Sequence, residues 1–174
     1  MTCEEIFSDL TNHMLEGLMI HEQFIDYYDF LGLPGYSKTH KHHFNSENKA
    51  YRKICHYYIT TKNKLLPKSQ FPQPEVIPAS WRQYTRQDVD AKTKQNAIKS
   101  GLEKWVKWET DTLEFYLTIH KQLIDINEVA DAEQVKCLIL DVQEELQTAT
   151  QYHLNKIATG YDMVDIIEEQ DKKD

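Results

Sequence analysis

The chain has 174 residues, of which 40% are hydrophobic and 28% charged, and its net charge is −8. This length suits one domain spanning residues 1–174, and the composition is that of a folded protein. No apolar run is long enough to cross a membrane, the acidic N-terminus lacks the pattern of a signal peptide, and the three cysteines are scattered. We therefore expect a cytoplasmic protein without membrane contact, and the negative charge argues against a nucleic-acid partner.

Two helices joined by a short turn are predicted for the first part of the chain. The first runs over residues 3–31 and begins at a capping box formed by Thr2 and Glu5. The second runs over residues 37–65, with Ser37 as its N-cap. Both carry an apolar stripe at helical spacing. Because only about five residues separate them, we expect the two helices to be antiparallel.

A proline-rich connection over residues 67–84 precedes a second pair of helices. The third helix is expected to start near Thr85 or later and to end near Asn127. The fourth runs over residues 131–160, with Gly160 as a left-handed residue at its C-terminus. The turn between these two helices is again short, so they too are expected to be antiparallel.

This order of elements predicts an all-α fold, an antiparallel four-helix bundle made of two helical hairpins. The connection between the hairpins is long enough to cross the length of the bundle, whereas an up-down-up-down bundle would need only a short one. A short C-terminal helix and a tail are expected over residues 161–174.

Two glutamates lie at the centre of the apolar stripes of their helices, Glu47 on the second and Glu109 on the third. An ionised carboxylate is costly in a protein core unless it is paired or bound to a metal ion. Glu22 and Glu145 are expected at about the same level of the bundle. Both lie on the shoulder of their stripes, and His21 is better centred than Glu22.

Two explanations remain open for the inward carboxylates. Tyrosine, tryptophan or histidine side chains of the core would satisfy them by hydrogen bonds. A metal ion would also satisfy them, and His43, four residues before Glu47 on nearly the same face, would add a nitrogen ligand. Mixed nitrogen and oxygen ligands suit iron, manganese and zinc.

The inward glutamates resemble the pattern of ferritin-like di-iron proteins, in which four helices direct carboxylates to the bundle centre. The stretch LEKWVKWETDTLEFYLTIHKQL (102–123) is similar to the third ferritin helix, HEQF (21–24) to the first and FNSENKAYRK (44–53) to the second. This resemblance implies Glu22, Glu47, Glu109 and Gln143 as metal ligands. Glu145, expected at the same level of the bundle, and His43, one turn before Glu47, are further candidate ligands.

The chain departs from the family's pattern at two ligand positions. The Glu-x-x-His motif of the second helix ends here at Ala50, and the glutamate that bacterial members carry three residues after Gln143 is Leu146. Two functions therefore stay open. One is a metal-binding protein that holds iron or manganese and oxidises ferrous iron with O₂, as a ferroxidase does. The other is a metal-free bundle that serves as an oligomeric scaffold or protein-interaction module.

Two tyrosine-rich segments, residues 24–31 and 54–59, are apolar almost all the way round their helices. Such helices are usually covered on more than one side, and tyrosine is enriched at interfaces. We therefore expect a homodimer or a larger homo-oligomer, as ferritin-like chains commonly form.

Overall fold

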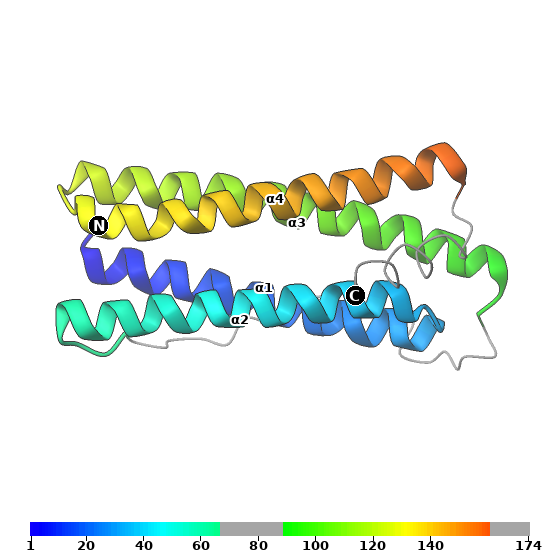
Figure 1. Cartoon of the computed structure of the whole chain (residues 1–174), viewed down its shortest axis with the longest axis horizontal. Coiled ribbons are helices and arrows are strands. Elements are labelled where there is room, and N and C mark those ends of the chain that lie inside the picture. Colours follow the sequence, from blue (N-terminus) through cyan, green and yellow to red (C-terminus); the bar gives the residue numbers. More distant parts are fainter. Residues whose placement is uncertain (67–88, 161–174) are drawn as a thin grey trace.

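The computed structural model describes residues 1–66 and 89–160, which form four long helices lying side by side (Figure 1). Within these two ranges the chain has no strand, so the all-α fold class is confirmed. The predicted connection over residues 67–84 and the predicted elements over residues 161–174 lie outside the described residues. The four helices are α1 (Cys3–Leu31), α2 (Pro34–Lys62), α3 (Ala91–Asp125) and α4 (Val129–Thr159).

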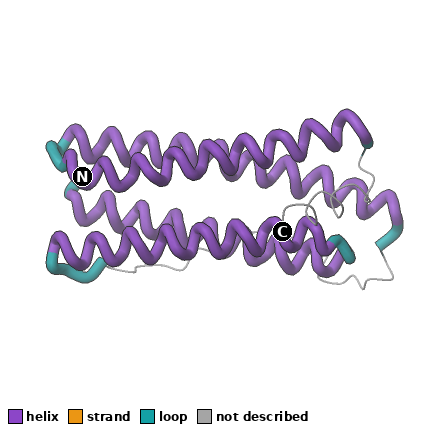
Figure 2. Tube along the Cα trace, viewed as in Figure 1, coloured by secondary structure: helices purple, strands orange, loops and turns teal. Residues whose placement is uncertain are grey.

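The helices form two antiparallel hairpins, α1 with α2 and α3 with α4, each closed by a short turn (Figure 2). At one end of the bundle Lys62, at the end of α2, pairs with Asp131 in the first turn of α4 at 2.8 Å. At the other end Tyr28, near the end of α1, packs against Gly101 of α3. Helix α1 is therefore parallel to α4, and α2 is parallel to α3. The chain between Lys62 and Ala91 consequently joins opposite ends of the bundle.

The capping box that begins α1 is confirmed. The Thr2 hydroxyl accepts a hydrogen bond from the Glu5 backbone N–H, and the Glu5 carboxylate accepts one from the Thr2 backbone N–H at 2.7 Å. The prediction that Ser37 caps α2 is wrong, because α2 already begins at Pro34. Proline suits the first helical turn, where its fixed φ fits and its missing N–H is not needed. Gly32 ends α1 with a φ of 70°, which leaves a turn of two residues.

The second hairpin starts and ends close to the predicted positions. Helix α3 is capped by Asp90, whose carboxylate accepts a hydrogen bond from the Thr93 backbone N–H at 2.7 Å. Helix α4 begins two residues earlier than predicted and ends at Gly160. The φ of Gly160 is 82°, but its ψ of 162° differs from the left-handed helical conformation that we expected.

A polar layer divides the core of the bundle into two apolar clusters. One cluster fills the end where α1 begins, and its fully buried members include Phe7, Leu123 and Val135. The other fills the opposite end around Phe24 and Leu102. Between the clusters each helix contributes polar side chains to the interior, and these are His21, His40, His43, Glu47, Glu109 and Glu145. The fold thus isolates one group of ionisable residues near the middle of the bundle.

The tyrosine-rich segments bury most of their apolar side chains within the single chain. Phe24, Tyr28 and Tyr58 are almost completely buried, and Ile59 is the large apolar residue of these segments that stays exposed. The bundle itself thus covers most of these two segments, and the expected homo-oligomer stays a prediction. Among the described residues, no helix is both long enough and apolar enough to cross a membrane.

We predict that Gly101→Ala destabilises the protein by about 1–3 kcal/mol, because the new methyl group would overlap the hydroxyl oxygen of Tyr28 across the α1–α3 contact. The hydroxyl group is buried without a hydrogen bond. Adding Tyr28→Phe should therefore restore more than half of the loss in the free energy of unfolding. Urea denaturation measures the free energy of unfolding of Gly101→Ala and of the double variant. Gln95→Ala, an exposed change on the same helix, should stay within about 0.5 kcal/mol of the original protein, and equal losses in all three would contradict the assignment.

Candidate metal centre

Three side chains of the polar layer converge from three helices. His21 of α1 lies with its Nε2 atom 3.3 Å from Oε1 of Glu47 on α2 and 3.8 Å from Oε1 of Glu109 on α3. One potential ligand atom of each residue lies within 4.8 Å of those of the other two. His21 and Glu109 are fully buried and Glu47 is partly buried. We call these three residues the central triad.

Each carboxylate of the central triad keeps one oxygen atom without a hydrogen bond. Oε1 of Glu109 accepts a hydrogen bond of 2.9 Å from the indole N–H of Trp105, one turn earlier on α3. Oε2 of Glu109 and Oε2 of Glu47 are buried and have no hydrogen-bond partner, and the same is true of Nε2 of His21. Buried polar atoms without partners are rare in native proteins and call for an explanation such as an ion or water.

A glycine on α1 makes room for the carboxylate of Glu47. A methyl group at Gly17 would lie 2.9 Å from Oε2 of Glu47 and 3.3 Å from the ring of Trp108. Any larger side chain at this position would push the carboxylate away from its place beside His21. The absence of a side chain at residue 17 is therefore part of how the central triad is built.

A second histidine holds the ring of His21 from the side opposite the carboxylates. The Nδ1 atoms of His21 and His40 are 2.9 Å apart, so one of them donates a hydrogen bond to the other. His40 is fully buried and stacks on Phe24 at 4.4 Å between ring centroids. The edge of Trp105 packs against the same imidazole at 4.8 Å. These contacts fix the orientation of both imidazole rings.

The charges around the two imidazoles assign their protons. Burial alone would lower the pKa of His21, but the negative charges of Glu47, Glu109 and Glu145 outweigh it and raise this pKa to about 9. Burial and the neighbouring His21 hold the pKa of His40 well below its usual range. In the metal-free protein His21 is therefore a cation at neutral pH and donates to neutral His40. Burial and the charge of Glu145 raise the pKa of Glu109 well above its usual range.

A second acid–histidine pair lies next to the central triad. Nδ1 of His43 on α2 is 3.3 Å from Oε1 of Glu145 on α4. The ring of His43 stacks on that of His21, with 5.5 Å between centroids and 21° between planes. Trp105 packs edge-on against His43 at 5.2 Å. The fourth helix thus reaches the polar layer through Glu145.

The structure brings together some of the predicted metal ligands and separates others. Glu47 and Glu109 meet in the central triad, and His43 pairs with Glu145 beside it. Glu22 and Gln143 are exposed to solvent and lie outside this group. For Glu22 the reason is helical phase, because the core-facing position of this turn of α1 is occupied by His21.

The residue that sequence reasoning undervalued is His21, which was placed on the core stripe but was not among the predicted ligands. Its central position on that stripe, in contrast to the shoulder position of Glu22, was the feature that could have identified it. The hydrogen bond from Trp105 to Glu109 is indicated in the sequence only by the spacing of four residues between them. His43 is the predicted nitrogen ligand beside Glu47, but the imidazole that lies next to Glu47 is that of His21.

No model of a known protein family matches the chain, and comparison with curated protein sequences finds no match. The function must therefore be argued from the geometry and chemistry of the polar layer itself.

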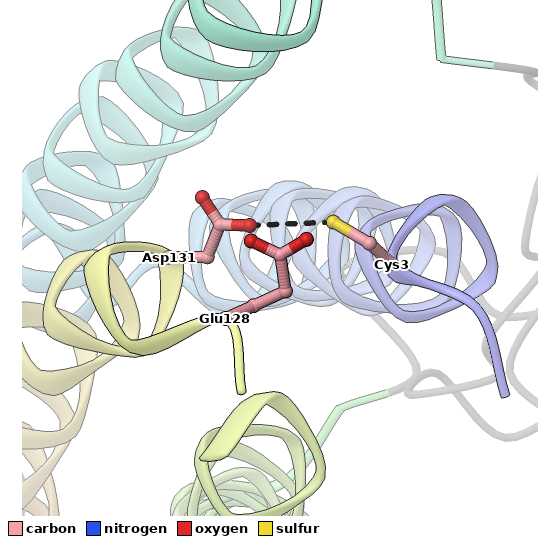
Figure 3. A group of neighbouring side chains, drawn as sticks. All are labelled: Cys3, Glu128 and Asp131. Carbon is pink, nitrogen blue, oxygen red and sulfur yellow. Dashed lines mark hydrogen bonds between the residues drawn. The ribbon is translucent and has the colours of Figure 1, made fainter. Parts of the chain in front are cut away.

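A second group of three potential ligands lies at the end of the bundle, where Cys3, Glu128 and Asp131 point toward one another (Figure 3). Nζ of Lys62 already occupies the position that a metal ion would take there, at 2.8 Å from Asp131 and 3.0 Å from Glu128. The Tyr57 hydroxyl and the Cys3 thiol also donate to Asp131. Burial and the Asp131 carboxylate raise the pKa of Cys3 to about 11, so the thiol stays protonated. We interpret this group as a polar link between helix ends.

The central triad, in contrast, fits a metal ion. It offers one imidazole nitrogen and two carboxylates from three separate helices, a donor set that suits iron, manganese or zinc. It is buried, and it contains unpaired oxygen atoms on both glutamates. The positive charge of protonated His21 occupies this place in the metal-free protein, so the imidazole must lose its Nε2 proton before that atom can bind an ion.

We predict that the free energy of unfolding of the metal-free protein falls by about 3 kcal/mol between pH 6.5 and pH 9. The pKa of His21 in the folded state, about 9, lies above the ordinary value of 6.5 that applies to the unfolded chain. The folded protein therefore retains a proton that the unfolded chain loses, and this stabilisation is complete below pH 6.5 and lost as the pH rises through 9. The raised pKa of Glu109 acts in the same direction.

Urea denaturation at several pH values in the presence of a chelator measures the slope of the free energy of unfolding against pH. His21→Gln should flatten this slope. His13 is a suitable control, because burial lowers its folded-state pKa from 6.5 to about 4, so it affects stability mainly between these two pH values and little within the tested window. A slope that persists in His21→Gln, or one that is lost in His13→Gln, would contradict the assignment.

Proposed function

We propose that this protein is a metal-binding four-helix bundle that holds a divalent transition-metal ion, iron or manganese, at His21, Glu47 and Glu109. The observation that carries the proposal is the convergence of these three side chains, two buried and one partly buried, from three helices, with potential ligand atoms within 4.8 Å of one another. Glu47 and Glu109 also retain buried oxygen atoms without hydrogen bonds. Buried acids that serve only a structural role are normally fully satisfied.

The chain's own residues would divide the work at such a site. Glu47 and Glu109 would supply negative charge from α2 and α3, while His21 supplies a nitrogen ligand once its Nε2 proton has left. His40 accepts a hydrogen bond from Nδ1 of His21, and a hydrogen bond to the nitrogen atom that does not bind the metal fixes a ligand imidazole in one orientation. Bound iron would supply one-electron exchange with O₂, the chemistry of a ferroxidase-like oxidoreductase.

We also propose that the bundle is ferritin-like. The directions of its helices support this, because two antiparallel hairpins are joined across opposite ends of the bundle. Inward carboxylates at the same level on α2, α3 and α4 support it further. The site differs from the family's pattern in that α1 offers His21 and not Glu22, and in that Ala50 and Leu146 stand at ligand positions.

A specific observation favours the alternative, a metal-free bundle that acts as an oligomeric scaffold. The cationic His21 lies between two acids, and Trp105 donates to Glu109, so much of the buried charge is already balanced without an ion. Exposed apolar side chains on the outer faces of α3 and α4, among them Leu117, Leu140 and Leu154, would serve such a protein as a contact surface.

Elemental analysis by mass spectrometry tests the proposed site. Protein purified without a metal-affinity tag should bind at least one ion per chain after anaerobic loading with Fe²⁺ or Mn²⁺. Glu47→Gln, Glu109→Gln and His21→Gln should each abolish most of this binding. Glu22→Gln is the matched control, because it removes the same charge from an exposed position next to His21 and should leave binding unchanged.

Stability separates loss of a ligand from misfolding. In Glu109→Gln the carboxylate of Glu47 still faces His21 and the new amide oxygen can accept the hydrogen bond from Trp105, so the metal-free variant should stay folded and unfold cooperatively. Absence of bound metal in the original protein under both loading conditions would overturn the metal-binding proposal and favour the scaffold. Equal loss of metal in Glu22→Gln would show that the ion binds elsewhere.

A further inference from the structure

A groove of about 440 Å³ lies between α2 and α4, next to the central triad. All the residues that line it come from these two helices, whereas the described helices pack closely in the pairs α1–α2, α3–α4 and α1–α3. The groove is therefore the side on which the bundle is least tightly closed. Its wall includes His42, His43, Ser46, Asp141, Glu144 and Glu145.

The groove adjoins a small inner cavity of about 40 Å³. Ser46, Asp141 and Glu145 line both spaces. The inner cavity is also lined by Glu47 of the central triad and by Tyr116. A volume of about 10–15 Å³ already admits one water molecule, so this cavity is large enough for a small ion that keeps part of its hydration shell. Glu47 is itself partly exposed, so the central triad lies close to solvent on this side of the bundle.

One buried polar group on the wall of the groove has no hydrogen bond. The side chain of His43 lines the groove and is 9% exposed. Its Nδ1 atom makes no hydrogen bond, although Oε1 of Glu145 is 3.3 Å away, and its other face stacks on the imidazole of His21. An imidazole nitrogen in this position is suited to bind a cation between the groove and the central triad.

The wall contributed by α4 is acidic. Asp141, Glu144 and Glu145 lie within five consecutive residues and line the groove together, and Lys38 is the lysine among the lining residues. Clefts lined by one sign of charge raise the local concentration of counter-ions and speed their association. A small cation is the class of ligand that fits this charge pattern. It also fits the gap between the two helices and the buried imidazole of His43.

We propose that the groove between α2 and α4 is the access route by which a hydrated divalent transition-metal cation reaches the central triad. Asp141 and Glu144 concentrate the cation at the mouth, and His43 with Glu145 receives it on the way to Glu47. This inference rests on the proposed function, because it assigns a path to the same metal centre. The residues on this face of the molecule act on the rate at which the ion binds and not on the number of ions bound.

Stopped-flow mixing of the metal-free full chain with Co²⁺ tests the route, since the visible absorption of Co²⁺ changes when it acquires protein ligands. The double variant Asp141→Asn/Glu144→Gln should bind the same number of ions, with an association rate at least threefold lower at low salt. The difference should shrink at high salt, where exposed charges are screened. The matched control is Glu103→Gln/Glu114→Gln, which removes two charges from exposed positions on α3 and should bind at the original rate.

A second variant tests the passage itself. Ser46→Phe places a large side chain on the wall shared by the groove and the inner cavity, and it should slow binding at high salt as well. Circular dichroism and the thermal midpoint confirm that the bundle is intact. Unchanged rates in both the double variant and Ser46→Phe would overturn the access route while leaving the metal centre in place. Absence of Co²⁺ binding in the original protein would overturn the proposed function and this inference with it.

Discussion

The structure depends on one positive charge in the middle of a hydrophobic bundle. Two glutamates project into the core from α2 and α3, and burying two negative charges close together is prohibitive without compensation. The imidazolium of His21 lies beside both of them and provides this compensation. The apolar core is interrupted at this level for the same reason, and its two clusters lie on either side of the interruption. Glu145 adds a further negative charge that favours the protonated form of His21 and so raises its pKa.

The supporting contacts hold the central triad in one arrangement before any ligand arrives. His40 accepts the hydrogen bond from Nδ1 of His21, and Trp105 donates one to Glu109. The missing side chain of Gly17 lets the carboxylate of Glu47 approach α1. A proton on His21 and a metal ion would occupy the same position between the same two acids. The choice between them is therefore a competition between two cations for one pre-formed anionic site.

Helical periodicity was sufficient to predict the four helices and the inward direction of Glu47 and Glu109, because both depend on short-range spacing along the chain. Ser37 was mistaken for a cap because a good capping residue competes with proline at the first helical position, and proline prevailed. Glu22 was favoured by resemblance over His21, although periodicity alone placed His21 closer to the core. The hydrogen bond between His21 and His40 was beyond sequence reasoning, since it depends on how two helices are rotated against each other.

The central triad takes two of its members, His21 and Glu47, from the first hairpin and one, Glu109, from the second. Each hairpin is held together by close packing along its own length, whereas the contact between the hairpins is thinner and leaves a groove between α2 and α4. An ion bound to all three residues would therefore cross-link the two hairpins, α1–α2 and α3–α4. Loading with metal would then make the middle of the bundle more resistant to any displacement of one hairpin relative to the other.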